Sequence, residues 1–224
     1  MEDLEVLLRS NAIFASLPPL DLKELARLAS GRMYEKDEKV ILYGDVWPYL
    51  LFVAKGSVEA VKESAEGRNL LVTTFPKGQT FWGLAFFQDD APMPVTLQAH
   101  ESSLIYLWSR ETVMPILIRN GQSAWELCRL MAVRMQYASE ILEGLAFQSV
   151  AGRVARLLLE QYPAHQSVVP RHLTLDEMAS RVGTTREIVC RILYRFAEQG
   201  AIQINRTEFT FMDRSLLEEQ SHKN

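Results

Sequence analysis

One segment near the C-terminus, residues 174–196, constrains the fold of this chain more than any other stretch. Thr174 and Glu177 have the Thr-x-x-Glu spacing of a capping box, in which two side chains accept backbone amide protons at the start of a helix. Gly183 is expected to end that helix. A second Thr-x-x-Glu run, from Thr184, is expected to cap another helix with apolar residues at helical spacing. Two short helices joined by a glycine turn predict a helix-turn-helix.

The polar face of the second helix indicates a function. Arg186, Glu187 and Arg191 project from its first two turns, where a recognition helix meets base edges in the major groove of DNA. Arginine pairs with guanine through two hydrogen bonds, and a carboxylate accepts from cytosine N4. The same spacing is common on solvated helices, so the alternative is an exposed charged face without a partner. The glycine turn, the apolar packing position at Val189 and the hairpin pattern that follows agree with one another and favour DNA binding.

The charge of the whole chain does not indicate a nucleic-acid partner, because its 224 residues carry a formal net charge of -4. The distribution of the charge does, since five arginines and two glutamates lie between Arg181 and Arg206. Attraction to phosphate needs a local basic face rather than a basic protein. The C-terminal third of the chain is therefore compatible with a DNA partner.

The sequence predicts a cytoplasmic protein with no membrane partner. No apolar run approaches the roughly 18 residues that span a bilayer, and the N-terminus, MEDLEVLLRSN, is acidic where a signal peptide is basic. Cys128 and Cys190 are far apart and lack Cys-x-x-Cys spacing, so neither a disulfide framework nor a cysteine-built metal site is expected. We expect each cysteine to be a small buried apolar residue.

The first half of the chain changes from helical to strand periodicity near residue 32. Residues 1–30 are predicted to form short helices, with a break at Pro18 and Pro19. From residue 32 to about residue 108, β-rich runs such as KVILYG and YLLFVAKG alternate with turn residues. The turn residues include the glycines Gly44, Gly56, Gly67 and Gly78. Short strands at this spacing predict a compact antiparallel barrel or sandwich.

A long helical stretch follows, from about residue 111 to 147, and its apolar residues form an unbroken a/d seam with steps of four and three. The seam consists of Ala124, Cys128, Met131, Met135, Ala138, Leu142 and Leu145. A single stripe can simply bury against its own domain, but here a second stripe is formed by Leu127, Leu130 and Ile141. Two stripes indicate two partners, namely the barrel and the same helix of a second subunit. The prediction is a homodimer, whose two-fold axis matches the palindromic sites that helix-turn-helix dimers read.

Two further features surround the helix-turn-helix. Residues 148–152 are the predicted hinge between the long helix and a new amphipathic helix, and residues 162–171 are a predicted loop. After the recognition helix, AIQI and FTFM are predicted to be two strands around residues 205–208. This hairpin predicts a wing, and Arg206 at its tip can reach a phosphate.

The chain resembles a transcription regulator of the CRP/FNR family over nearly its full length. The barrel glycines, the dimer helix and the winged helix-turn-helix occur in the family's order. The resemblance implies an α+β fold with an N-terminal antiparallel β-roll of the cyclic-nucleotide-binding type (residues 1–110, with the N-terminal helices), a long central dimerisation helix (111–147) and a C-terminal winged helix-turn-helix (148–224). It also implies RNA polymerase as a partner, besides double-stranded DNA and a second copy of the chain.

The run TTREIVCR at residues 184–191 is similar to the recognition helix of the cyclic-AMP receptor branch, whose arginine, glutamate and arginine read TGTGA-like half-sites. The resemblance therefore assigns base contacts to Arg186, Glu187 and Arg191, with Thr184 and Thr185 beside them on DNA. In the fumarate-nitrate branch the first arginine is replaced, so a TTGAT-type half-site is not expected.

The pocket segment departs from the family pattern. Members that bind cyclic nucleotides carry a cassette resembling F-G-E-L…P-R-x-A-T, in which the glutamate grips the ribose and the arginine the phosphate. The matching runs here are FWGL at 81–84 and PMPVT at 92–96, which replace the glutamate with Gly83 and the arginine with Met93. A buried phosphate without its arginine is an uncompensated charge that costs several kcal/mol. The sequence therefore predicts that cyclic AMP is not bound usefully.

The predicted pocket is apolar, and three occupants fit it: an aromatic ligand, a haem, or side chains that simply fill the core. Its lining consists of Trp82, Gly83, Phe86, Phe87, Met93 and Thr96. The segment FFQDDAPMPVTLQA is similar to that of a family branch that controls the hybrid-cluster-protein response to nitrosative stress, where haem is implicated. A haem would need an axial ligand such as His100 or Met93. The N-terminal cysteine cluster of oxygen-sensing members is missing, which disfavours an iron-sulfur sensor.

Three classes of function compete for this sequence. The first is a homodimeric, sequence-specific transcription regulator whose β domain senses an effector. The second is a cyclic-nucleotide-binding module that regulates an attached protein, which the lost arginine and the helix-turn-helix disfavour. The third, an enzyme, is not expected, because the sequence has no nucleophile-base constellation, glycine-rich phosphate loop or metal-ligand spacing.

Overall fold

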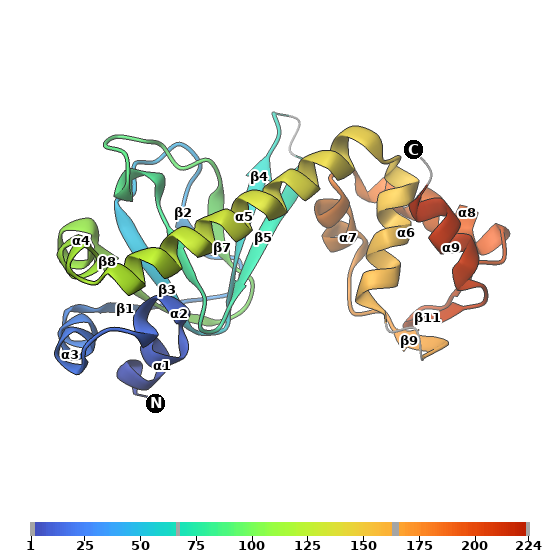
Figure 1. The fold of residues 1–224 in the computed structure, drawn as a ribbon. Coiled ribbons are helices and arrows are strands. Elements are labelled where there is room, and N and C mark those ends of the chain that lie inside the picture. The colour runs from blue at the N-terminus through green and yellow to red at the C-terminus, as the bar shows by residue number, and fades with distance from the viewer. Residues whose placement is uncertain (1–2, 66–67, 163–165, 223–224) are drawn as a thin grey trace. The chain divides into compact units, whose positions relative to one another are not determined.

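The computed structural model describes residues 3–65, 68–162 and 166–222. Contacts divide the chain into two units: Met1–Lys62 with Val72–Gln136, and Glu63–Leu71 with Tyr137–Asn224. The element order, with helices before a strand-rich part and helices again after it, is shown in Figure 1. The predicted α+β class is confirmed.

Three short helices open the first unit: α1 (Leu4–Ser10), α2 (Ala12–Ala15) and α3 (Pro19–Leu28). The side chain of Asn11 caps α2 by accepting from the amide of Ile13 at 3.0 Å, and its amide group donates to the carbonyl oxygen of Gly78 at 2.9 Å. One asparagine thus starts a helix and ties it to the turn between two strands.

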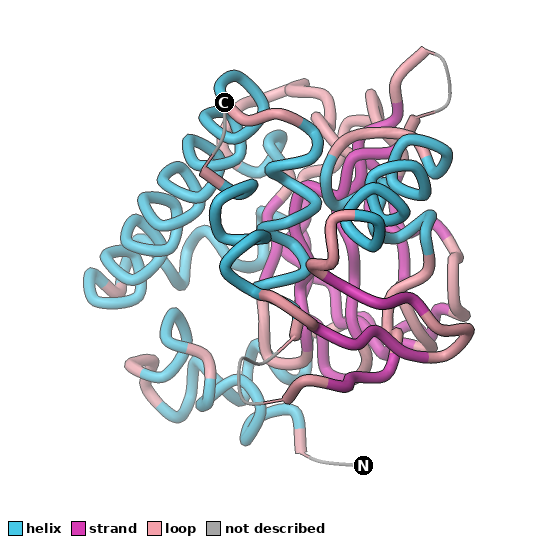
Figure 2. Tube along the Cα trace, turned by 90° about the vertical axis from the view of Figure 1, so that its right-hand side faces the viewer, coloured by secondary structure: helices cyan, strands magenta, loops and turns pink. Residues whose placement is uncertain are grey.

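Two four-stranded sheets form the roll of the first unit, drawn in magenta in Figure 2. One sheet has the order β1-β8-β3-β6 and the other β2-β7-β4-β5, so the predicted antiparallel β domain is confirmed. The strands are β1 (Ser30–Tyr34), β2 (Lys39–Ile41), β3 (Tyr49–Lys55), β4 (Ser57–Glu63), β5 (Asn69–Pro76), β6 (Thr80–Trp82), β7 (Thr96–Ala99) and β8 (Ser103–Ser109), with a short 3₁₀ helix, η1 (Leu84–Phe86), after β6.

Strand β3 separates two hydrophobic cores because successive side chains of a strand point to opposite faces. Leu50 and Phe52 pack in the core beneath the N-terminal helices, whereas Leu51 and Val53 pack in the core inside the roll. Both faces of β3 are therefore covered, which explains why YLLFVAK is almost continuously apolar rather than alternating.

The turns between strands use left-handed backbone where the sequence analysis expects glycine. Gly44, Gly56 and Gly78 have φ values of 88°, 77° and 85°. Asp37 takes the same conformation with φ of 66°, a role that aspartate tolerates better than most residues. The predicted turn at Gly67 lies outside the described residues.

The helical stretch predicted from residue 111 to 147 is not one continuous helix but two, with a break at Asn120. Helix α4 (Arg110–Arg119) ends at Asn120, whose backbone is extended, and α5 (Gly121–Phe147) follows. The Asn120 side chain accepts from the amide of Ser123 at 3.2 Å and so starts a new helix. The 27 residues of α5 carry the whole predicted seam.

The part of the second unit from residue 150 onward is called the winged domain below. It contains α6 (Val150–Gln161), β9 (Val168–Pro170), α7 (Leu175–Val182), α8 (Arg186–Glu198), β10 (Ile202–Ile204), β11 (Glu208–Phe211) and α9 (Arg214–Ser221). The predicted hairpin of β10 and β11 is confirmed. The predicted loop at 162–171 is corrected, because β9 pairs with β11 and completes a three-stranded sheet.

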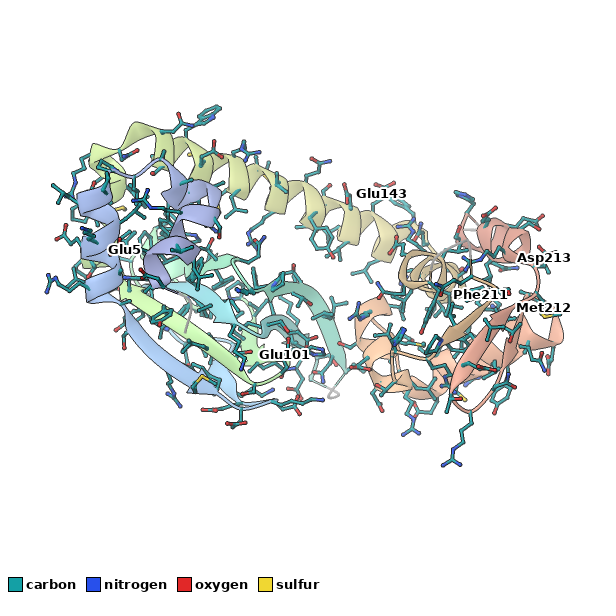
Figure 3. All side chains as sticks on the ribbon, turned by 90° about the horizontal axis from the view of Figure 1, so that it is seen from below. Glu5, Glu101, Glu143, Phe211, Met212 and Asp213 are labelled. Carbon is teal, nitrogen blue, oxygen red and sulfur yellow. The ribbon has the colours of Figure 1, made fainter. Side chains whose placement is uncertain are left out.

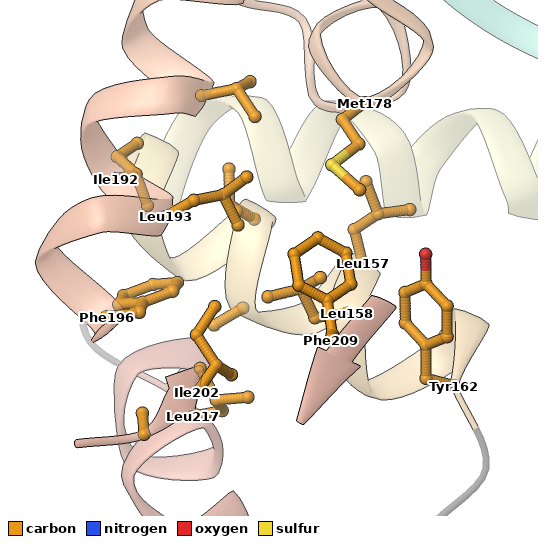
Figure 4. Packing of buried hydrophobic residues seen from close by; sticks show 14 of the residues in the cluster. Leu157, Leu158, Tyr162, Met178, Ile192, Leu193, Phe196, Ile202, Phe209 and Leu217 are labelled. Carbon is orange, nitrogen blue, oxygen red and sulfur yellow. The ribbon is translucent and has the colours of Figure 1, made fainter. Parts of the chain in front are cut away.

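The core of the winged domain gathers side chains from all its helices and from β10 and β11 (Figure 4). Leu158 of α6, Phe196 of α8 and Phe209 of β11 are fully buried in it. At the end of β11, Phe211 is buried whereas the next residue, Met212, is exposed (Figure 3). The winged domain thus has a core of its own, separate from those of the roll.

Neither cysteine is the buried residue that the sequence predicts. Cys128 on α5 is exposed and Cys190 on α8 is half-buried, and both are free thiols. Cys128 belongs to the α5 seam, which the chain leaves uncovered, and Cys190 lies at the edge of the buried stripe of α8, where periodicity does not separate a buried position from an exposed one.

Candidate nucleic-acid interface and effector region

The helix-turn-helix consists of α7 and α8, and local hydrogen bonds set the start of α7. The hydroxyl of Thr174 accepts from the amide of Glu177 at 3.2 Å, and the amide of Thr174 donates to the Glu177 carboxylate at 2.6 Å. Gly183 ends α7 in the left-handed conformation, with φ of 68°. The predicted capping box and glycine turn are confirmed.

Helix α8 starts one residue later than its predicted cap. Thr185, not Thr184, is the N-cap, and its hydroxyl accepts from the amide of Ile188 at 3.4 Å. Thr184 continues the turn, since its amide donates to the carbonyl oxygen of Ala179 at 3.0 Å. The side chain of Thr184 is only 6% exposed, so the structure does not place it on the surface as a DNA contact. The packing of the turn, rather than the Thr-x-x-Glu spacing, decides which threonine caps.

The three predicted base-reading residues share one side of α8. Arg186, Glu187 and Arg191 are exposed, and Thr185 is half-buried at the start of the same side. The opposite side of the helix is buried in the core of the winged domain through Val189, Ile192, Leu193 and Phe196. Helix α8 therefore presents a charged surface of two arginines and one glutamate to solvent.

Local interactions keep Glu187 ionised. Its carboxylate accepts from its own backbone amide and from the hydroxyl of Thr185, and it lies near Arg186, so the pKa of Glu187 is lowered from its ordinary value. A carboxylate at the start of a helix is also favoured by the helix dipole. Glu187 is thus an ionised hydrogen-bond acceptor at the N-terminal end of α8.

The wing places a single arginine at its tip. Arg206 is exposed between β10 and β11, where the amide of Asn205 donates to the carbonyl oxygen of Glu208 at 3.0 Å. Arg171 supports the turn, because its amide donates to the carbonyl oxygen of Thr207 at 2.8 Å and its guanidinium lies 5.1 Å from the ring centre of Phe209. The geometry of the tip is therefore held by residues other than Arg206.

The seam of α5 is largely uncovered within the chain. Met135 and Leu142 are 74% and 67% exposed, and of the other seam residues only Ala124 is as much as half-buried. Leu127 of the second stripe is buried, and Leu130 packs against the same core beneath the N-terminal helices. Leu127 and Leu130 of the second stripe thus pack within the first unit, whereas the seam is an apolar surface that the chain leaves uncovered.

The predicted pocket lining does not surround one space. Trp82 and Phe86 pack beneath the N-terminal helices, with ring centres 4.7 Å apart, whereas Met93 lies in the other core, inside the roll. Phe87 is exposed, and the hydroxyl of Thr96 already accepts a hydrogen bond from the amide of Tyr43 at 3.0 Å. The prediction of a common apolar lining was wrong, because the two faces of the first sheet separate its members.

Gly83 is a point of close approach rather than a pocket position. A Cβ atom at this residue would collide with the carbonyl oxygen of Trp47. The amide of Gly83 donates to the carbonyl oxygen of Tyr49 at 3.1 Å. A larger residue, such as the glutamate of the family cassette, does not fit here unless the backbone moves.

The two candidate haem ligands do not converge. Met93 is buried inside the roll, and Leu97 and Ala99 of β7 point into the same core. His100 continues the alternation of β7 on the opposite face, where its Nδ1 lies 3.0 Å from the Glu59 carboxylate. The two side chains therefore offer no shared axial site for one iron.

Arg134 of α5 contacts the roll but is not among the residues predicted to line the effector pocket. Its Nη2 donates to the carbonyl oxygen of Thr80 at 2.9 Å, and its guanidinium lies 4.6 Å from the ring centre of Phe75. Burial lowers the pKa of Arg134, although the group remains a cation at neutral pH. Arg134 follows Leu127 by seven residues, and residues seven apart lie on the same side of a helix. This spacing is the signal that could have placed Arg134 on the stripe facing the roll.

Within the described parts of the chain, no helix combines the length and apolarity needed to cross a membrane.

Two family profiles match the chain in the regions that these elements occupy. The cyclic nucleotide-binding domain matches residues 31–120, which cover the roll, and the Crp-like helix-turn-helix domain matches residues 152–220, which cover the winged domain. The order of the two domains is that of the resemblance identified from the sequence.

Curated relatives match nearly the whole chain. The cyclic AMP receptor protein of Thermus thermophilus is 25% identical over 216 residues, which are 95% of this chain and 97% of that protein. The cAMP-activated global transcriptional regulator Vfr of Pseudomonas aeruginosa is 28% identical over 198 residues, which are 82% of this chain and 91% of that protein.

Solved structures have the same fold. The c-di-GMP responsive global regulator CLP of Xanthomonas campestris has a TM-score of 0.74 at 20% identity, covering 87% of this chain and 99% of that one. A regulator of the Crp/Fnr family from Eubacterium rectale also has a TM-score of 0.74, at 21% identity, covering 94% of this chain and 98% of that one. With its roll, winged domain and relatives in agreement, the chain belongs to the CRP/FNR family of transcription regulators.

Proposed function

We propose that this chain is a homodimeric, sequence-specific regulator that reads a TGTGA-like palindrome through Arg186, Glu187 and Arg191 and does not respond to cyclic AMP. The observation that carries the proposal is the single exposed surface of α8 on which these three side chains lie. We further propose RNA polymerase as a partner of this regulator.

The chemistry of the α8 surface supports the half-site. Two arginines suit the guanines of TGTGA, because each guanine presents O6 and N7 as paired acceptors in the major groove. The ionised carboxylate of Glu187 suits the amino group of a cytosine on the complementary strand. Arg206 at the wing tip adds a contact to phosphate that carries no sequence information.

The α5 seam supports the dimer. Its exposed apolar side chains repeat with heptad spacing, as expected of a helix that packs along a two-fold axis. A two-fold dimer presents two copies of α8, and this symmetry is that of a palindrome.

The interior of the roll supports independence from cyclic AMP. Met93, at the position of the phosphate-binding arginine in the family, is buried among apolar side chains, and its amide already donates to the carbonyl oxygen of Asp45 at 2.8 Å. Arg134 is engaged with Thr80 and Phe75, so it is not free to replace the lost arginine. A phosphate buried here would lack a dedicated counter-charge.

An electrophoretic shift assay tests the proposal with a duplex that carries TGTGA and TCACA separated by six base pairs. We expect the full chain to bind it without added nucleotide, and Arg186→Ala to weaken binding by about 1–3 kcal/mol for each half-site and relax the preference at one base pair of each. Arg9→Ala is the matched control, because it removes an exposed arginine from α1. Absence of binding to any duplex, or equal binding by Arg186→Ala, would contradict the assignment.

A further inference from the structure

Tyr194 lies near the centre of the exposed side of α8. Successive helical residues are turned by about 100°, so with Arg186 at zero the buried residues of α8 centre at about 290° and the exposed side at about 110°. On the same scale Tyr194 lies at about 80°, between Arg186 and the row formed by Glu187 and Arg191 at about 100° and 140°. Tyr194 therefore faces the same way as the predicted base readers.

The ring of Tyr194 is more exposed than is expected of a residue that only packs in the core. It is 63% exposed, whereas the other aromatic side chains of the winged domain, Tyr162, Phe196, Phe209 and Phe211, are buried. Its hydroxyl makes no hydrogen bond to any side chain or backbone group within the described residues. A large ring on a rigid helix, with a free hydroxyl donor on the ring, can contact a binding partner and lose little side-chain entropy on binding.

The position of Tyr194 along the helix indicates which part of DNA it meets. It lies eight residues after Arg186, which is about 12 Å along the axis and in the third turn of α8. The first turns of a recognition helix read base edges, while groups beyond them meet the sugar-phosphate backbone as the straight helix leaves the curved groove. Tyrosine hydroxyls are among the side-chain donors that contact phosphate oxygens. Arg191 and Arg195 lie beside Tyr194, at about 140° and 180° on the same scale, and favour a phosphate there.

We infer that Tyr194 is a further DNA-contacting residue of α8, whose hydroxyl donates a hydrogen bond to a phosphate oxygen at the edge of each half-site. The inference rests on the proposed function, since it requires that α8 enter the major groove by its N-terminal end, which carries Arg186. The contact positions the helix and adds affinity, but it reads no base.

The test begins with the wild-type full chain, which selects its preferred duplex from a random-sequence library. Tyr194→Phe, which removes only the hydroxyl, is then compared with the wild type on the selected duplex and on a scrambled one. Each hydrogen bond to a charged group contributes roughly ten-fold in affinity, and the proposed dimer has two copies of Tyr194, so we expect roughly 100-fold weaker binding to both duplexes. Because the hydroxyl is neutral and releases no counterion, the dependence of log Kd on log salt should keep its slope.

Two controls accompany this variant. Tyr43→Phe removes the hydroxyl of a tyrosine that is 69% exposed in the roll and should bind like the wild type. Arg206→Ala should weaken binding and also lower the salt slope by about two, because each subunit of the dimer loses one charged phosphate contact. Thermal melting checks that each variant is folded, because substitutions at exposed positions of this kind are expected to leave the melting temperature nearly unchanged.

Two outcomes would overturn the inference. Wild-type affinity in Tyr194→Phe would show that the hydroxyl makes no contact, and a changed preference at one base pair would show that it reads a base instead. A wild-type chain that selects no sequence at all would count against the proposed function itself, and is distinguishable because it appears before any variant is tested.

Discussion

The Nε of Arg153 donates to the carbonyl oxygen of Val182 at 2.8 Å and so joins α6 to the last residue of α7. Its Nη1 donates to the carbonyl oxygen of Gln148 at 2.8 Å, just beyond the end of α5. Burial lowers the pKa of Arg153, and the group is still charged at neutral pH. One guanidinium thus satisfies carbonyl groups at the ends of two helices that would otherwise lack donors.

Replacement of this arginine should loosen the helix-turn-helix. Arg153→Met leaves those carbonyl groups without a donor, and we expect it to lower the free energy of unfolding by about 2–3 kcal/mol. Urea denaturation followed by circular dichroism measures the change. Arg156→Met on the same helix is the matched control, because Arg156 is exposed, and it should change stability by less than about 0.5 kcal/mol. Equal effects of the two variants would contradict a specific role for Arg153.

Two glycines of the second unit should respond to alanine with opposite signs. Gly183 has φ of 68°, and a Cβ atom there would lie 3.2 Å from Leu70 Cδ1, so Gly183→Ala should lower stability by about 1–2 kcal/mol. Gly144 is inside α5, and its nearest contact would be Gln148 Oε1 at an ordinary 3.6 Å. Gly144→Ala should therefore raise stability by about 0.5–1 kcal/mol, as in other helix interiors. Melting temperatures of the pair measure both effects, and a loss in both variants would contradict this account.

A charge in the α5 seam should separate the proposed dimer. Leu142→Lys places an ammonium group at an exposed seam position that would be buried between two helices, whereas Glu143→Lys changes the neighbouring residue outside the seam (Figure 3). We expect sedimentation to show a dimer for the wild type and for Glu143→Lys, and a monomer for Leu142→Lys. The monomer should also lose affinity for the palindrome, because two half-sites are no longer bound together. A wild-type monomer at concentrations that bind DNA would refute the dimer.

The contribution of Glu187 should not depend on pH near neutrality. Hydrogen bonds from its own amide and from Thr185 lower the pKa of Glu187 in the folded protein. Interactions that hold the ionised form are present above the pKa of the unfolded chain, about 4.3, and are lost as the pH falls through the lower folded value. The preference for cytosine at its base pair should thus be constant from about pH 5 to 8. Binding to base-substituted duplexes measures it, and a preference that declines between pH 7 and 5 would contradict this assignment.

Cyclic AMP should have no effect on this protein. We expect titration calorimetry to show binding weaker than about 1 mM, and DNA affinity to be the same with and without the nucleotide. The alternative is that the roll would bind cyclic AMP if only the missing arginine were restored, and Met93→Arg tests it. We expect this variant not to bind the nucleotide but to destabilise the roll by several kcal/mol, because it buries a cation among apolar side chains. Tight binding of cyclic AMP by the wild type would overturn the proposal.

Much of the winged domain could be predicted because its signals are local. A capping box such as Thr174 with Glu177 is made by atoms three residues apart, and the left-handed turn at Gly183 depends on a single φ angle. The exposed side of α8 follows from helical periodicity alone, which is why Arg186 and Arg191 were placed on one surface.

The roll and its interior could not be predicted in the same way. Trp82 and Met93 are similar apolar residues near each other in the sequence, yet they lie in different cores because the first sheet passes between them. Thr185 rather than Thr184 caps α8 because the turn buries Thr184 and leaves Thr185 only half-buried.

Periodicity and short-range hydrogen bonds therefore determined the helix-turn-helix, its charged face and the seam of α5 from the sequence by itself. The tertiary structure decided which of two neighbouring apolar side chains enters which core, how β9 joins the wing and where Arg134 meets Thr80. The physical reason is range: a helix cap or stripe depends on residues a few positions apart, whereas a pocket depends on the pairing of strands far apart in the chain.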